Sequence, residues 1–70
     1  MNYKPEEIVL NVIHKWYPDP CPMGQVKVYF GEEEYEYLNT LVSTLEAKDL
    51  LTHDIIENTL TLTKEGKRLL

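Results

Sequence analysis

An α+β fold, in which helices are followed by a β-hairpin, is the class that this sequence predicts. Apolar residues recur with helical spacing in residues 5–17 and again in residues 33–48. Residues 50–62 are instead rich in β-forming residues and end in a run that alternates between threonine and leucine. The chain has 70 residues, and a chain this short buries only about 60% of its unfolded surface. We therefore expect a single domain over residues 1–70, with the large apolar residues in one core.

The first helix is expected to run from Pro5 to about Tyr17. Pro5 suits the first helical position, where its missing N–H is no loss, and Glu6 and Glu7 complement the positive end of the helix dipole. One broad apolar stripe follows, made of Ile8, Val9, Val12, Ile13 and Trp16. The prolines between positions 18 and 22 should end this helix.

Leu10 and Tyr17 lie off this stripe, about 100° or more from its centre at 100° per residue. Two interpretations remain open for them. They are partly buried under the chain ends, or they form a contact with a second copy or another partner.

Residues 23–30 are ambiguous between helix and strand. A helix starting after Pro22 places Met23, Val26 and Phe30 on one side. A strand alternates Val26, Val28 and Phe30 against their neighbours, and the β-branched content favours it. We expect a short helix, because Gly31 before a long helix is typical of a tight helix–turn–helix corner.

The second long helix is expected over Glu33–Lys48. Its apolar side consists of Tyr35, Leu38, Leu41, Val42 and Leu45. Opposite them lie Glu36, Thr40, Ser43 and Ala47, flanked by Asn39 and Thr44. Glutamates at positions 32, 33, 34 and 36 suit the helix start electrostatically, and Asp49 can close the helix.

Residues 50–62 predict a hairpin with a two-residue tip, Glu57-Asn58, since asparagine tolerates the positive φ that such tips need. Leu60 and Leu62 should face the core, and the threonines between and beside them should face outward. Thr63 is a plausible N-cap for a last, short helix from Lys64.

The order of these elements resembles the winged helix-turn-helix superfamily and is similar to small bacterial and phage regulators of the MarR and PadR type. Two motifs carry the resemblance: residues 41–51 at the exit from the long helix, and the later Leu62-Thr63-Lys64-Glu65-Gly66. The resemblance covers about Pro5 to Leu70. It implies a three-helix core, a C-terminal wing of two or three strands, and a truncated last helix.

The resemblance also implies a mode of binding to DNA. Helix 33–48 would occupy the position that enters the major groove, and residues 53–59 would be the wing beside the backbone. Asp49 stands where the family usually has glycine. The charge of the chain differs further from that of a DNA-binding member of the family. Residues 32–48 contain five glutamates and one lysine, and the whole chain has a net charge of -5. Carboxylates near phosphates lose Coulomb energy, so this composition weakens the expectation of DNA binding.

The first functional hypothesis is transcription regulation, in which the protein binds DNA weakly or as a homodimer through helix 33–48 and the wing. Nucleic-acid contacts are then expected from Asn39, Thr40, Ser43, Lys48, Asn58, Lys64, Lys67 and Arg68. Base-edge contacts contribute about 1–3 kcal/mol each. Phosphate anchors would be the basic members of this set, together with Lys27, and a dimer would double them.

The alternative is an acidic protein-interaction module that uses the same fold without binding DNA. It would present the acidic helix 33–48 and the off-stripe residues Leu10 and Tyr17 to a partner with a basic or apolar face.

Other functions are not expected from this sequence. The candidates for metal binding or nucleophilic chemistry are His14, Cys21, His53 and Asp54, and none has zinc-ligand or catalytic spacing. We therefore expect no enzyme, no cofactor, no metal and no evident small-molecule ligand. No apolar run could span a bilayer, and the N-terminus has no signal pattern. One unpaired cysteine fits a reducing compartment, so we expect a cytoplasmic protein.

Overall fold

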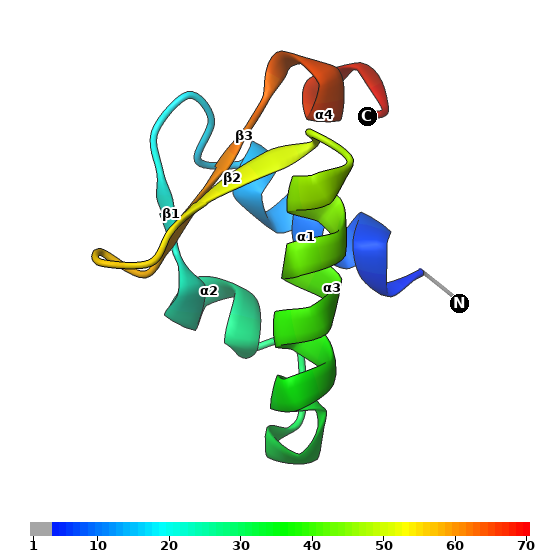
Figure 1. Ribbon diagram of the computed structural model, residues 1–70, viewed down its shortest axis with the longest axis vertical. Helices are drawn as coiled ribbons and strands as arrows, with labels where there is room; N and C mark the ends of the chain where they lie inside the picture. The colour runs from blue at the N-terminus through cyan, green and yellow to red at the C-terminus, as the bar shows by residue number, and fades with distance from the viewer. Residues whose placement is uncertain (1–3) are drawn as a thin grey trace.

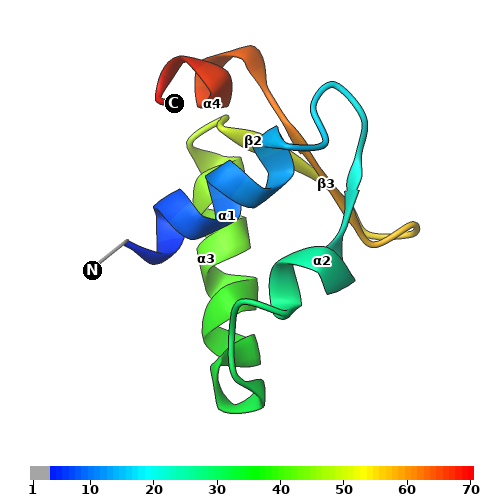
Figure 2. The same cartoon turned by 180° about the vertical axis from the view of Figure 1, so that it is seen from behind.

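The computed structural model describes residues 4–70 and confirms the α+β class (Figure 1). Helices pack on one side of a small antiparallel sheet, whose hairpin projects from the body (Figures 1 and 2). The elements in chain order are α1 (Pro5–His14), β1 (Cys21–Pro22), α2 (Met23–Lys27), the 3₁₀ turn η1 (Glu32–Glu34), α3 (Tyr35–Ala47), β2 (Leu51–Asp54), β3 (Thr59–Leu62) and α4 (Lys64–Arg68). This arrangement is compatible with a winged-helix layout.

The sheet has three strands in the order β1-β3-β2, all antiparallel. Leu60 is the centre of the sheet, because it lies opposite Cys21 on β1 and opposite His53 on β2. The short strand β1 was not expected from the sequence, which shows only a proline-rich connection there. It forms because Met23 N–H also donates to the carbonyl of Asn58 at 2.9 Å, which draws the connection against the hairpin.

Helix α1 ends at His14, so the expected end near Tyr17 is wrong. Residues 15–17 continue as turns, in which the N–H groups of Trp16 and Tyr17 bond three residues back, to Ile13 and His14, at 3.1 Å. Pro18 has no N–H to donate to the carbonyl of His14, so a regular helix cannot continue through it. Trp16 consequently leaves the apolar stripe and is exposed.

The short-helix interpretation of residues 23–30 is confirmed over Met23–Lys27. Met23 and Val26 are buried, as a helix requires, whereas Val28 and Tyr29 follow the helix and are exposed. The chain then passes Gly31 into η1, where Gly31 N–H donates to the Glu34 carboxylate at 2.9 Å.

Helix α3 begins at Tyr35 rather than at Glu33, because the preceding glutamates form η1. Its apolar side is as expected, with Leu38, Leu41, Val42 and Leu45 all buried. Asp49 ends the helix with a φ of 63°, and Leu50 N–H reaches back to the carbonyl of Leu45 at 3.0 Å. Asp49 thus takes the left-handed position in which glycine is most common.

The hairpin tip contains four residues, Ile55–Asn58, so the expected two-residue tip is wrong. The last strand pair is Asp54 with Thr59, and the Asp54 carboxylate accepts a hydrogen bond from Glu57 N–H at 3.1 Å. This side-chain bond closes the wider turn. Asn58 has a φ of 56°, which confirms its expected conformation.

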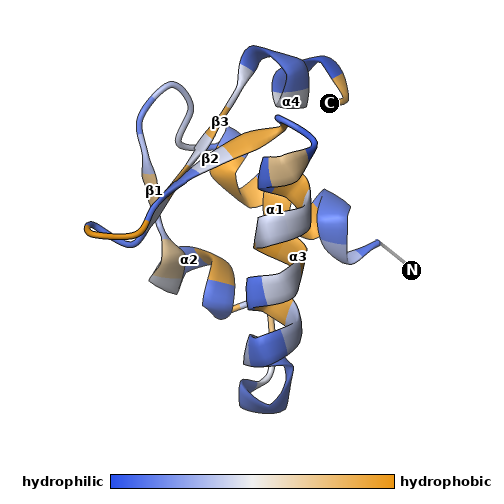
Figure 3. Cartoon of the chain, in the orientation of Figure 1, coloured by the Kyte–Doolittle hydropathy of each residue, from blue (hydrophilic) through white to orange (hydrophobic). Residues whose placement is uncertain are grey.

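One hydrophobic core joins α1, α2, α3 and the sheet. Its buried members are Val9, Leu10, Val12, Ile13, Cys21, Met23, Val26, Leu38, Leu41, Val42, Leu45, Leu51, Leu60 and Leu62. Leu60 and Leu62 therefore face the core as predicted, and the threonines beside them are partly exposed. Figure 3 shows the apolar ribbon of α1 and α3 meeting behind the polar outer side of α3.

Helix α4 is held against the corner between α3 and β2. Thr63 is its N-cap as predicted, since its hydroxyl accepts from Gly66 N–H at 3.0 Å and donates to the Asp49 carbonyl at 2.7 Å. Gly66 is buried, and a Cβ at this position would collide with the carbonyl oxygen of Leu50.

Gly66→Ala should therefore lower the free energy of unfolding by about 1–3 kcal/mol, the usual cost of overpacking a tight contact. Gly24→Ala is the matched control, because a Cβ at Gly24 meets nothing within 4 Å. In α2 that change should be neutral or stabilise the fold by up to about 1 kcal/mol. Urea unfolding followed by circular dichroism measures both, and equal effects of the two variants would contradict the assigned packing.

Candidate interaction surface

All eight residues predicted to contact nucleic acid are exposed, but they lie on three separate parts of the molecule. Asn39, Thr40 and Ser43 lie on the outer side of α3. Asn58 lies at the hairpin tip, and the basic residues at positions 48, 64, 67 and 68 lie at the far end of α3 and on α4. Figure 1 shows the hairpin tip and α4 at different ends of the molecule, so these groups do not form one compact site.

The polar groups on α3 are partly engaged by the helix itself. The Thr40 hydroxyl donates to the Glu36 carbonyl at 3.2 Å, and the Thr44 hydroxyl donates to the Thr40 carbonyl at 3.0 Å. Within residues 4–70, the side chains of Asn39 and Ser43 make no such bond. These two side chains are therefore the polar groups of this helix side that a partner can use most directly.

Residues 31–58, which comprise η1, α3 and the hairpin, form a strongly acidic part of the surface. We call the following carboxylates, all of them exposed, the acidic surface: Glu32, Glu33, Glu34, Glu36, Glu46, Asp49, Asp54 and Glu57. Lys48 is the only lysine or arginine in that range, so the net charge of the segment is -7 with histidine neutral.

The positive charges lie mainly elsewhere, and several are already engaged. Lys27 Nζ lies 5.0 Å from the ring centre of Tyr35, and Lys67 Nζ lies 4.9 Å from that of Tyr17. Such cation–π contacts at exposed sites contribute only about 0.5–1 kcal/mol. Arg68 pairs with Glu65 at 3.1 Å across one turn of α4. A ligand that recruited these cations would first displace weak internal partners.

Leu10 and Tyr17 have surroundings that match the burial interpretation. Leu10 is only 4% exposed and belongs to the core, which leaves little of it for another molecule. It lies with the C-terminal Leu69 and Leu70 around a small hollow of about 180 Å³. Tyr17 is half-buried beneath Lys67.

The hairpin tip carries two exposed isoleucines that sequence reasoning missed. Ile55 is 81% exposed and Ile56 is 92% exposed, and Figure 3 shows the tip in orange at the end of the hairpin. The signal was present, because adjacent residues of a strand point to opposite faces and both isoleucines could not enter the core. A two-residue tip at Glu57-Asn58 would instead place both isoleucines in the first strand of the hairpin.

The tip is well held, although its isoleucines have no packing partners in the core. Glu57 N–H donates to Asp54, the Asn58 carbonyl accepts from Met23, and His53 Nε2 lies 3.4 Å from Asn58 Oδ1. The two apolar side chains are therefore presented on an ordered turn.

The structure offers no arrangement for metal chemistry among residues 4–70, where no three histidine, cysteine or acidic side chains are grouped to hold an ion. His14 is exposed on α1. In the same described range, no helix has the length and apolarity needed to cross a bilayer.

Cys21 is a core residue at the start of β1. Its side chain is fully buried, and the thiol lies 3.5 Å from the carbonyl of Pro22. Burial raises the pKa of the Cys21 thiol above its usual value, because the charged thiolate loses solvation. The thiolate is the reactive form, so this cysteine has the environment of a structural residue rather than of a nucleophile.

Comparisons of the chain with protein-family models, with curated proteins and with solved structures found no match. The functional argument therefore depends on the geometry and charge of the chain itself.

Cys21 should react with a disulfide reagent at least about tenfold more slowly in the folded protein than in denaturant at mildly alkaline pH, because it is buried and its pKa is raised. The release of the coloured thiolate from the reagent measures the rate. A folded protein that reacts as fast as the unfolded chain would show that this part of the core opens freely.

Proposed function

We propose that this chain is a small regulatory module with a winged-helix fold, which binds a protein partner through α3 and the hairpin. The order of elements supports the fold: β1 lies between α1 and α2, Gly31 begins the turn into α3, and the β2–β3 hairpin follows as the wing. In winged-helix terms, α3 is the recognition helix. A fold alone does not specify a ligand, so the partner is inferred from the surface.

The acidic surface is the observation that carries the proposal. Affinity for DNA comes largely from lysine and arginine replacing the counterions of phosphates. Residues 31–58 offer eight exposed carboxylates and only Lys48, so a duplex brought to α3 and the wing would meet net repulsion. The same charge attracts a protein face rich in lysine and arginine and suppresses binding to acidic partners.

The outer side of α3 supplies more than charge. Tyr37 is about half exposed on one flank of this side, near the start of the helix, and Asn39 and Ser43 are exposed toward the other flank. Tyrosine is among the residues enriched at interface centres, because it combines a large apolar ring with a hydroxyl. A basic partner surface with an apolar centre is therefore the kind of face that fits α3.

The proposal that α3 binds a basic protein partner is tested with a photo-crosslinking amino acid at position 39, in cells that express the full chain. We expect adducts to a protein, and a marked loss of them when Glu32, Glu33 and Glu36 are changed together to glutamine. The three glutamates are exposed, so this variant should keep the fold. The same amino acid at position 64 on α4 is the control. Adducts to nucleic acid at position 39, or protein adducts that do not depend on the glutamates, would contradict the proposal.

A second candidate function is DNA-linked transcription regulation. It is favoured by a group of basic side chains at the C-terminal end of α3 and on α4. Lys48, Lys64, Lys67 and Arg68 are all exposed near the corner where α4 packs on the end of α3. A duplex approached from this corner would meet these cations before the acidic surface. Two copies together would double the number of phosphate contacts.

Anisotropy of a labelled random duplex at low salt separates the two candidates. We expect no binding up to a protein concentration of about 50 µM. Proteins that bind DNA non-specifically typically have dissociation constants between about 1 and 100 µM, so this concentration is a fair test. Binding that weakens steeply with salt, and that disappears when Lys64, Lys67 and Arg68 are changed to alanine, would instead favour the second candidate. Lys15→Ala, in the turn that follows α1 and outside this corner, is the matched control.

A further inference from the structure

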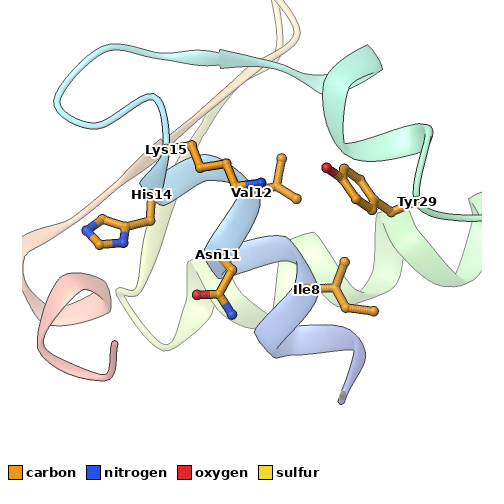
Figure 4. A pocket seen from close by; sticks show the side chains of 6 residues that line it. All are labelled: Ile8, Asn11, Val12, His14, Lys15 and Tyr29. Atoms are coloured by element: carbon orange, nitrogen blue, oxygen red, sulfur yellow. The ribbon is translucent and has the colours of Figure 1, made fainter. Parts of the chain in front are cut away.

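A hollow of about 660 Å³ lies between α1 and Tyr29, which follows α2, and no residue of the acidic surface lines it. Figure 4 shows its lining: Ile8, Asn11, Val12, His14, Lys15 and Tyr29. Ile8 and Val12 on α1 face the ring of Tyr29 across the opening. The hollow is therefore apolar at its centre.

Lys15 gives this hollow a positive rim. Its side chain extends beside Val12 on the side that faces Tyr29, whereas His14 points away from Tyr29. Asn11 is tied to its own helix, since its side-chain amide donates to the Glu7 carbonyl at 2.8 Å. An occupant with an apolar body and an adjacent carboxylate would match these groups.

The hairpin tip of the same chain has this chemistry. Ile55 and Ile56 are the two most exposed large apolar residues described, and Asp54 and Glu57 flank them. The Asp54 carboxylate is engaged in holding the turn, which leaves the Glu57 side chain as the available partner for a cation. The turn is ordered by its own hydrogen bonds, so little conformational freedom is lost on insertion.

We propose that the hairpin tip of one copy inserts into the α1–α2 hollow of a second copy. Ile55 and Ile56 would contact Ile8, Val12 and Tyr29, and Glu57 would pair with Lys15. The inference goes beyond the proposed function, because it concerns a different occupant and leaves the outer side of α3 open to a protein partner.

The contact joins two different patches, so it is heterologous. Figures 1 and 2 show the tip projecting to one side of the molecule. The hollow lies on the body of the molecule, where residues of α1, Lys15 and Tyr29 line it. Each copy that donates its tip keeps a vacant hollow for another copy. Heterologous contacts form a ring when the rotation closes and an open chain when it does not.

The association should be weak. The surface buried by one tip in one hollow should be less than the roughly 1,000 Å² that stable interfaces bury. Two copies with a net charge of -5 each also repel one another, although this is largely screened beyond about 8 Å at physiological salt. We expect a dissociation constant between about 10 µM and 1 mM at that salt.

Analytical ultracentrifugation from about 10 µM to 1 mM tests the proposal on the full chain, a range that brackets weak association. The wild-type protein should show a mass that rises with concentration. Ile56→Ser on the tip and Tyr29→Ser in the hollow should each weaken association at least about tenfold, which corresponds to about 1.4 kcal/mol. Val28→Ser is the matched control, because Val28 is 74% exposed beside Tyr29 but does not line the hollow.

Two further measurements identify the contact. Lys15→Glu should weaken association, and adding Glu57→Lys in the same chain should restore it, because the ion pair is reversed. A mixture of the Ile56→Ser and Tyr29→Ser variants should stop at a 1:1 dimer, since one retains only a tip and the other only a hollow.

A wild-type chain that stays monomeric up to about 1 mM would overturn the proposal, because this is the weak limit of the expected range. So would association that Val28→Ser reduces as much as Tyr29→Ser does, or a variant mixture that fails to pair. Circular dichroism confirms that each variant is folded. Failure here would leave the crosslinking result at position 39 unaffected, because that experiment reports on α3.

Discussion

The corner between α3 and β2 fixes how α3, the hairpin and α4 are placed relative to one another. Asp49 adopts the left-handed conformation there, and the carbonyl of Leu50 accepts a hydrogen bond from Thr63 N–H at 3.2 Å. Gly66 approaches the same carbonyl closely enough that no side chain fits between them. Because α3, the sheet and α4 meet at this point, its geometry sets the direction in which the hairpin leaves the helix. The acidic surface and the hairpin tip are displayed together as a consequence.

Charge is divided across this corner. The segment from Gly31 to Asn58 has a net charge of -7, while the chain as a whole has -5, so the remaining residues together carry a net positive charge of 2. If the fold is the winged helix proposed above, its recognition helix α3 carries the same sign of charge as the phosphate backbone. The proposed fold and the observed surface then favour different ligands, and we give more weight to the surface, because its charges act directly on a partner.

The sequence predicted most of what periodicity controls and less of what depends on single contacts. The buried leucines of α3, the inward Leu60 and the Thr63 cap followed from spacing and cap chemistry. Strand β1 did not, because two residues have no period and their pairing depends on a distant carbonyl at Asn58. The eight polar and basic residues chosen for nucleic acid are exposed, but sequence spacing could not show that the fold separates them.

The proposed self-association and the proposed partner binding would reinforce one another. Copies joined from tip to hollow would repeat the acidic side of α3 along an assembly, and a partner with several basic patches would then bind more than one copy. Such linkage raises overall affinity without new contacts, provided the spacing lets both sites engage. Repulsion between neighbouring acidic surfaces opposes growth, and a basic partner would neutralise that repulsion. The partner would therefore favour assembly, and assembly would in turn favour binding of the partner.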